Sequence, residues 1–258
     1  MARPGRRVRA ARREPARAAR HERTRGERSG QGSPCPRDCD APRRGGLLLL
    51  ERGEDSALAL REATTRGLEA RLLLTMMTET GRRSRSHGLS REVLSAQAGL
   101  IGLPILFRAT SWDDYEGEFR AAVSMAVSLG AGIGIFGDID IEAHRQWVES
   151  QCTMSGATAV LPRWRRDRAS LVHDLLDAGF DARIVAVRDG ALPPALLGRA
   201  LDDDVLDHLD RVGADLAGEN GEYHTVVTDG PIFSRPLWLT FGESTLRDGV
   251  WFVDAVVR

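Results

Sequence analysis

The stretch GLLLLERGEDSALALREATTRGLEARLLLT, residues 46–75, indicates the fold class of this chain of 258 residues. It begins with the apolar run 46–50 and ends with a second apolar run, 70–75, and both have the length of a buried strand. Between them, residues 55–66 show the apolar spacing that is typical of an amphipathic helix. The order strand, helix, strand is that of a β-α-β unit and predicts a parallel sheet.

The same alternation continues through most of the chain. We expect further helices at 90–101, 114–129, 140–154, 167–178 and 202–210. We expect further strands at 104–107, 132–136, 157–161 and 182–187. The last 35 residues instead show consecutive strands separated by turn residues. The predicted fold is therefore α/β, a Rossmann-like parallel sheet flanked by helices, with a smaller C-terminal α+β domain.

This pattern predicts three parts: a tail, 1–45, a nucleotide-binding domain, 46–154, and a substrate-binding domain, 155–258. Ligands of parallel α/β sheets bind beyond the carboxyl ends of the strands. We therefore expect the site in a cleft between the two domains.

Composition and charge exclude several classes of protein. All 36 basic residues are arginine, which excludes lysine Schiff-base chemistry and a lysine phosphate clamp. Three cysteines are too few for a disulfide scaffold, and the sequence shows neither a long apolar run for a membrane span nor the apolar core of a signal peptide. We expect a soluble, cytoplasmic protein without a membrane partner.

The tail 1–45 differs from the rest of the chain, because it holds 14 arginines against 5 acidic residues and almost no large apolar side chain. Such a segment cannot bury enough surface to fold, and we expect disorder. It is either an arginine arm for nucleic acid or a leader or over-extended reading frame. The second interpretation is favoured because the tail has no aromatic residue to stack on bases, so a nucleic-acid partner is not expected.

The most informative segment is GENGEYHTVVTDGPIF, residues 218–233. It places two carboxylates, an amide and an imidazole within six positions of a glycine-bracketed loop: Glu219, Asn220, Glu222 and His224. A site that binds a polar substrate and moves a proton needs such groups together. The alternative is a solvated loop with a structural histidine.

This segment resembles the signature GE-x-GEYHT-x-V-x-DGP-x-F of the diphthine ammonia ligase family. The resemblance extends over about residues 46–258, through FGDIDIEAHRQWVE at 136–149, LPRW at 161–164, GFDARIVAV at 179–187 and LLGRALD at 196–202. With the ending GESTLRDGVWFVD, the chain is most similar to the bacterial branch of that family.

The resemblance implies an N-type ATP pyrophosphatase fold of the adenine nucleotide alpha hydrolase-like class. It implies ATP and Mg²⁺ as cofactors and an ATP-dependent amide ligase reaction, in which a carboxylate is adenylated, AMP and pyrophosphate leave, and ammonia is the nitrogen donor. In the diphthamide enzyme the carboxylate belongs to elongation factor 2 of archaea and eukaryotes. A bacterial-branch protein is expected to use another carboxylate, on a small molecule or a protein.

The resemblance also implies roles for individual residues, and no protein ligand to a metal is predicted. Catalytic roles fall to Asn220, Glu222 and His224. Cofactor binding falls to Gly53, Asp55, Ser56, His87, Gly88, Gly137 and Asp138. Substrate binding falls to Arg145, Glu149, Gly218, Glu219, Gly221, Tyr223 and Thr225.

The phosphate loop departs from the family pattern Ser-Gly-Gly-Lys-Asp-Ser, because residues 51–56 read ERGEDS. Glu54 takes the lysine position and Glu51 the first serine position. A carboxylate about 4 Å from a phosphate costs on the order of 4 kcal/mol at an effective dielectric near 20. The alternative function is therefore a catalytically impaired homologue that binds a nucleotide or a metabolite.

Several positions allow a structural interpretation beside the functional one. His87 follows the second strand, as Arg83 and Gly88 do in an R-x-x-x-HG element of bacterial relatives, but could equally be a solvent histidine. Arg145 and Glu149 have the i, i+4 spacing of an ordinary helix ion pair. Cys152 is expected to pack as a small buried apolar group. Two further departures are Ala217, where relatives often have cysteine, and Arg163, where they have leucine.

Overall fold

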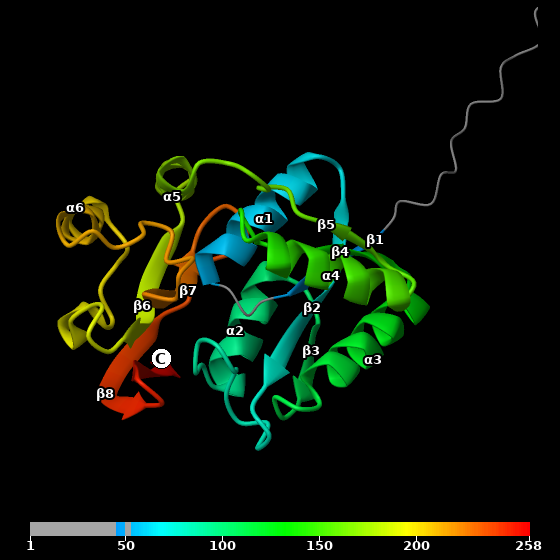
Figure 1. The fold of residues 1–258 in the computed structure, drawn as a ribbon, viewed down its shortest axis with the longest axis horizontal. Helices are drawn as coiled ribbons and strands as arrows, with labels where there is room; N and C mark the ends of the chain where they lie inside the picture. Colours follow the sequence, from blue (N-terminus) through cyan, green and yellow to red (C-terminus); the bar gives the residue numbers. More distant parts are fainter. Residues whose placement is uncertain (1–44, 50–52) are drawn as a thin grey trace, which may run out of the picture. The chain divides into compact units, whose positions relative to one another are not determined.

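The computed structural model describes residues 45–49 and 53–258, which belong to one compact unit (Figure 1). The expectations for the arginine-rich tail, and for Glu51 and Arg52 in the phosphate loop, lie outside these residues. Within the described part of the chain, no helix combines the length and the apolar character that a membrane span requires.

Five parallel strands form the first sheet, in the order β3-β2-β1-β4-β5. The chain runs outward from β1 to β3 on one side and then crosses to β4 on the other. The strands are β1 (Gly45–Leu49), β2 (Glu69–Met77), β3 (Ile105–Ala109), β4 (Ala131–Ile135) and β5 (Thr158–Val160). This order puts a switch point between β1 and β4, where a crevice opens beyond the carboxyl ends.

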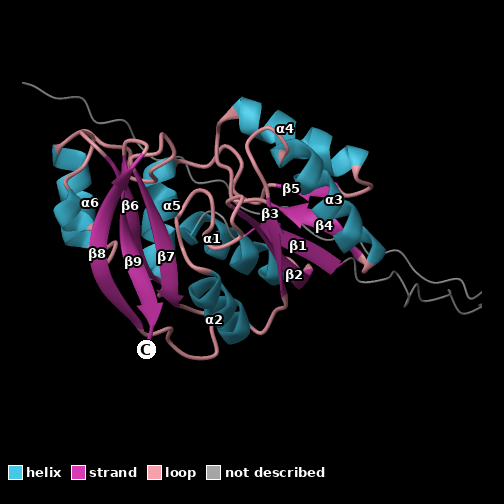
Figure 2. Cartoon of the chain, turned by 90° about the horizontal axis from the view of Figure 1, so that it is seen from below, coloured by secondary structure: helices cyan, strands magenta, loops and turns pink. Residues whose placement is uncertain are grey.

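Helices cover both faces of this sheet, as predicted (Figure 2). They are α1 (Gly53–Thr65) and α2 (Arg91–Ile101) on one face, and α3 (Tyr115–Ser128) and α4 (Glu142–Met154) on the other. Two apolar clusters hold these layers together. One joins Phe119 and Val123 of α3 to Leu74 and Met76 of β2, and the other joins α1 to Leu73.

The second sheet has four antiparallel strands in the order β7-β6-β9-β8. Its strands are β6 (Asp181–Arg188), β7 (Tyr223–Asp229), β8 (Leu239–Arg247) and β9 (Val250–Val257). Its other elements are α5 (Arg168–Asp177), α6 (Asp203–Arg211) and a 3₁₀ turn, η1 (Pro194–Leu196). Helices α1 and α2 lie between the two sheets, where α2 packs on the apolar face that contains Val185, Val226 and Val253 (Figure 2).

The predicted elements agree closely with the observed ones, because local signals set their ends. Ser90, Asp167 and Asp202 cap helices by accepting hydrogen bonds from backbone N–H groups three residues later. The strand predicted at 157–161 was placed in the C-terminal part, but the observed β5 pairs with β4 and so extends the first sheet past residue 154. The division into two domains at this point stays a prediction.

Candidate functional site

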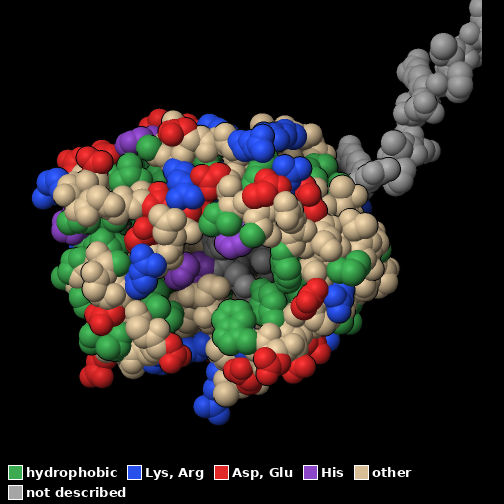
Figure 3. All heavy atoms as spheres, viewed as in Figure 1, with side chains coloured by type: hydrophobic (Ala, Val, Ile, Leu, Met, Phe, Trp, Pro, Cys, Tyr) green, Lys and Arg blue, Asp and Glu red, His purple; other side chains and the backbone are tan. Residues whose placement is uncertain are grey.

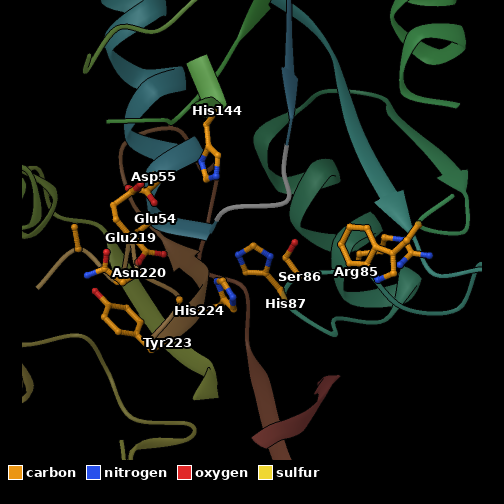
Figure 4. Close-up of a pocket in the computed structure, with 14 residues that line it drawn as sticks. Glu54, Asp55, Arg85, Ser86, His87, His144, Glu219, Asn220, Tyr223 and His224 are labelled. Carbon is orange, nitrogen blue, oxygen red and sulfur yellow. The ribbon is translucent and has the colours of Figure 1, made fainter. Parts of the chain in front are cut away.

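A cavity of about 430 Å³ lies beyond the carboxyl ends of the parallel strands. One wall contains the start of α1, the loop after β2, Trp112 after β3 and His144 of α4. The loop 217–221, with Tyr223 and His224 at the start of β7, completes the lining. Figure 3 shows this face hollowed, with histidine side chains beside the hollow, and Figure 4 shows the lining residues.

The first backbone N–H groups of α1 bond to side chains of the chain itself. Gly53 N–H donates to Nε2 of His87 at 2.9 Å, and Glu54 N–H donates to Oγ1 of Thr225 at 3.2 Å. The N-terminal N–H groups of a helix are the groups that would hold an anion. A phosphate at these two groups would have to displace His87 and Thr225.

Gly53 has a packing role at this junction. A Cβ at this position would lie 2.7 Å from the carbonyl carbon of Thr225 and would overlap the carbonyl oxygen. Glycine therefore allows the start of α1 to approach β7 closely. The resemblance assigned Gly53 to cofactor binding, whereas its observed close neighbour is Thr225 in a strand of the second sheet.

Asp55 is paired with a buried arginine that the sequence analysis treated only as a departure from the family. Arg163 donates to Oδ1 of Asp55 at 2.5 Å and to the carbonyl of Gly137 at 2.5 Å, and 2% of the Arg163 side chain is exposed. Gly137 is close as well, since a Cβ there would lie 2.9 Å from Asp55. Arg163 thus ties the start of α1 to the loop after β4.

The Glu54 carboxyl is buried and accepts a hydrogen bond from the Thr225 hydroxyl. Burial, with the Asp55 carboxylate as a second cause, raises the pKa of Glu54 to about 8. At pH 7 the Glu54 carboxyl is therefore mostly protonated. The repulsion between Glu54 and a phosphate is therefore smaller than the repulsion expected from the sequence for a fully charged carboxylate.

The loop 217–222 has a defined conformation. Gly218 and Gly221 adopt φ of 64° and 78°, in the left-handed region that favours glycine. The Asp215 carboxylate accepts hydrogen bonds from the N–H groups of Ala217 (3.1 Å) and Glu219 (3.0 Å), and Arg168 pairs with Asp215. The polar residues that this loop carries are thus held in place rather than solvated at random.

Three histidines lie at the cavity (Figure 4). The rings of His87 and His224 are 4.9 Å apart at 51°. His87 is 3% exposed, so it is not the solvent histidine of the alternative interpretation. Because its Nε2 accepts from Gly53, that nitrogen carries no proton. His144 Nδ1 lies 3.3 Å from Oδ1 of Asp138.

Asn220 lines the cavity, and its Nδ2 donates to Oε1 of Glu222 at 3.2 Å. Oε2 of Glu222 is buried and has no hydrogen-bond partner among the described residues. Tyr223 donates from its hydroxyl to the Leu216 carbonyl at 2.6 Å, and burial raises the pKa of this phenol well above its usual range. Tyr223 therefore acts here as a hydrogen-bond donor, and Glu222 orients Asn220.

The cavity brings together about half of the residues predicted for the site. The predicted residues that line it are Asp55, His87, Gly218, Glu219, Asn220, Gly221, Tyr223 and His224. The predicted residues that lie outside its lining are Gly53, Ser56, Gly88, Gly137, Asp138, Arg145, Glu149, Glu222 and Thr225. Arg145 and Glu149 form the ordinary ion pair, at 2.8 Å. The roles assigned to all these residues stay predictions.

Six lining residues were not predicted as site residues: Glu54, Arg85, Ser86, Trp112, His144 and Ala217. Arg85 and Ser86 lie inside the R-x-x-x-HG element, and His144 lies inside FGDIDIEAHRQWVE. Trp112 comes three residues after the end of β3. The rule that ligands bind beyond strand carboxyl ends was the available signal for Trp112.

The described residues fit a triphosphate poorly at the start of α1. Two of its N–H groups are engaged, the nearest acidic side chains are Glu54 and Asp55, and Arg163 is already bonded to Asp55 and Gly137. Among residues 45–49 and 53–258, no group of three or more His, Cys, Asp or Glu side chains is placed to hold a metal ion. We therefore assign no described residue to the phosphates or to Mg²⁺.

Comparisons with known proteins cover most of the chain. The family model "Diphthamide synthase N-terminal domain" matches residues 46–159, and "Diphthamide synthase C-terminal domain" matches residues 167–254. The chain is 24% identical over 226 residues to diphthine-ammonia ligase of Schizosaccharomyces pombe, which is 76% of this chain and 36% of that protein.

The matches to vertebrate proteins are shorter. The chain is 28% identical over 145 residues to diphthine-ammonia ligase of Danio rerio, 55% of this chain and 57% of that protein. It is 27% identical over 120 residues to the Homo sapiens protein of the same name, 45% of each. The chain thus spans between about a third and just over half of the length of these curated relatives.

Proposed function

The chain belongs to the diphthamide synthase family, and on that premise we propose that it is an ATP-dependent ligase that joins ammonia to a carboxylate. The similar curated proteins are named for diphthine and ammonia, which supports a carboxylate acceptor and ammonia as the nitrogen donor. The parallel sheet and its strand order are compatible with the nucleotide alpha hydrolase-like fold that this family implies. When bound, ATP would supply the activation of the carboxylate.

The observation that carries the proposal is that the polar residues Glu219, Asn220 and His224 line one cavity together with the start of α1 and His87. Ammonia is mostly ammonium at neutral pH, so the nitrogen must lose a proton before or during its attack. The Glu219 carboxylate attracts the cation, and the His224 imidazole is suited to take the proton. Asn220, oriented by Glu222, offers its amide to the acceptor.

A second candidate function has a specific observation in its favour. The N–H groups of Gly53 and Glu54 are engaged with His87 and Thr225, which leaves the start of α1 poorly suited to a triphosphate. The chain would then be a homologue that binds a nucleotide or metabolite in the same cavity without ligase turnover.

One assay separates the two candidates. The full chain is incubated with MgATP and ammonium and, in parallel, with a diphthine-bearing protein or a panel of small carboxylic acids, and AMP and amide formation are followed by mass spectrometry. The ligase proposal expects both products. Binding of MgATP or AMP by calorimetry without either product would favour the second candidate.

Matched variants assign the residues. His224→Ala is expected to lower the rate of amide formation by about 10²- to 10⁴-fold, the range for a lost acid-base group. Glu222→Gln removes the charge of the carboxylate that orients Asn220 and should lower the rate as well. His173→Ala on α5 and Glu243→Gln on β8 change exposed residues away from the cavity and should keep the wild-type rate. Equal rates in His224→Ala and His173→Ala would remove the loop from the proposed chemistry.

A further inference from the structure

Trp112 is the most exposed large hydrophobic residue of the described chain, yet it lines the cavity. It is 70% exposed and lies just beyond the carboxyl end of β3. An exposed indole has a large apolar surface, and a ligand that covers this surface is bound more tightly. Its place in the cavity lining points to a small molecule as the group that covers it.

The Trp112 ring is supported by its neighbours. The guanidinium of Arg85 lies 4.3 Å from the ring centroid, in cation-π contact. The Tyr115 ring lies 5.7 Å away at 34° and continues into an aromatic cluster with Trp147 and Phe119. The indole therefore has fixed contacts that position it, while most of its surface stays exposed.

Arg85 is itself held in place. Its side chain is 5% exposed, it pairs with Glu79 at 2.7 Å, and its Nε donates to the Thr110 carbonyl at 3.2 Å. Thr110 precedes Trp112 by two residues, so Arg85 fixes the backbone of this loop as well as one side of the ring. Ser111 Oγ accepts from Asp114 N–H at 3.0 Å and closes the turn that follows.

We propose that Trp112, supported by Arg85, is the stacking platform for the base of a nucleoside or nucleotide in this cavity. The inference rests on the proposed function, since it names the part of the cavity that takes the base. A planar heteroaromatic ring is the chemical class that best covers an exposed indole. The cavity volume of about 430 Å³ lies in the usual range for small-molecule sites.

The polar groups around the platform suit the rest of a nucleoside. Ser86 lies beside His87, and Glu219 and Asn220 line another part of the cavity (Figure 4). Hydroxyl, imidazole, carboxylate and amide groups are hydrogen-bond partners for ribose hydroxyls and ring nitrogens. The base contact does not depend on the N–H groups of α1 that bond to His87 and Thr225.

The test is calorimetric titration of the full chain with adenosine, which carries a base and no phosphate, and with ribose, which carries no base. Trp112→Ala is expected to raise the Kd for adenosine about five- to 140-fold, the equivalent of 1–3 kcal/mol for one stacked base. Trp112→Phe keeps an aromatic face and should stay within about threefold of wild type. In Trp112→Phe the quenching of indole fluorescence by adenosine should fall although binding persists.

Trp238→Ala is the matched control, because Trp238 is 62% exposed and lies outside this cavity. It should keep the wild-type Kd. An unchanged Kd in Trp112→Ala, equal binding of ribose and adenosine, or no adenosine binding by the wild type would each overturn the platform. These results concern the base contact, whereas the ligase proposal depends on the separate test for AMP and amide.

Discussion

The buried Glu54 carboxyl should make the free energy of unfolding depend on pH, and the single substitution Glu54→Gln should remove this dependence. Glutamine keeps the side-chain length and an oxygen that can accept from the Thr225 hydroxyl, but it cannot ionise. In the folded chain, burial and the neighbouring Asp55 raise the pKa of Glu54 from 4.5 to about 8. Only the wild type therefore has a carboxyl at this position whose pKa differs between the folded and unfolded states.

A carboxyl with a raised pKa binds its proton more tightly in the folded state. Its contribution to stability is fully present below pH 4.5 and is lost as the pH rises through 8. Between these values the free energy of unfolding of the wild type should fall, relative to Glu54→Gln, by about 1.4 kcal/mol per pH unit. From pH 5 to pH 9 the variant should gain about 4 kcal/mol over the wild type.

Urea unfolding of both proteins at pH 5, 6, 7, 8 and 9 measures this difference. Titrating groups that do not interact with Glu54 behave alike in both proteins and cancel in the comparison. Glu79→Gln is the control, because a backbone N–H bond and the Arg85 contact lower the pKa of this exposed carboxyl and its titration lies below the tested range. A difference between Glu54→Gln and wild type that stays constant from pH 5 to pH 9 would refute the buried, proton-binding role of Glu54.

Three further predictions follow from other contacts. Arg163→Leu leaves Asp55 without its buried cation and should lower the free energy of unfolding by about 3–5 kcal/mol, with part of the loss recovered in Arg163→Leu/Asp55→Asn. An unchanged midpoint of urea unfolding would show that the pair contributes nothing. Gly53→Ala should lower the free energy of unfolding by about 1–3 kcal/mol because the new Cβ meets Thr225, whereas Gly99→Ala in α2, with no atom within 4 Å of the new Cβ, should raise it by about 0.5–1 kcal/mol. Equal effects of the two substitutions would contradict the close approach of α1 to β7. Burial raises the pKa of Cys152 to about 12, so iodoacetamide at pH 8 should modify it only after unfolding, and labelling of the native chain, located by mass spectrometry, would contradict its burial.

The elements of this protein could be predicted from sequence because each depends on local signals. Apolar spacing marked α1 and the strands on either side of it, and side chains such as Ser90 and Asp167 set the starts of helices. Glu219, Asn220, Glu222 and His224 were predicted as site residues because they lie close together in sequence. Cys152 was expected in the core and is fully buried there.

The pairing of strands in the second sheet could not be predicted from local signals of this kind. β9 lies between β6 and β8, so strands that are far apart in sequence are neighbours. The edge of the first sheet shows the same limit. The short strand β5 was expected from the sequence, but its pairing with β4 was not. A strand pattern specifies the faces of a strand and leaves its neighbours to the packing of the whole chain.

The α/β pattern, the carboxyl-end loops and the polar loop before β7 could be predicted because they follow from periodicity and from residues close together in the chain. The charges and partners at the start of α1 depend instead on contacts between distant segments. There Thr225, 171 residues from Glu54, bonds to its carboxyl, and Arg163, 108 residues from Asp55, pairs with it. A carboxyl that looks like a full negative charge in the sequence becomes mostly protonated once burial removes it from water. That burial is produced by segments distant in sequence, so no local pattern contains it.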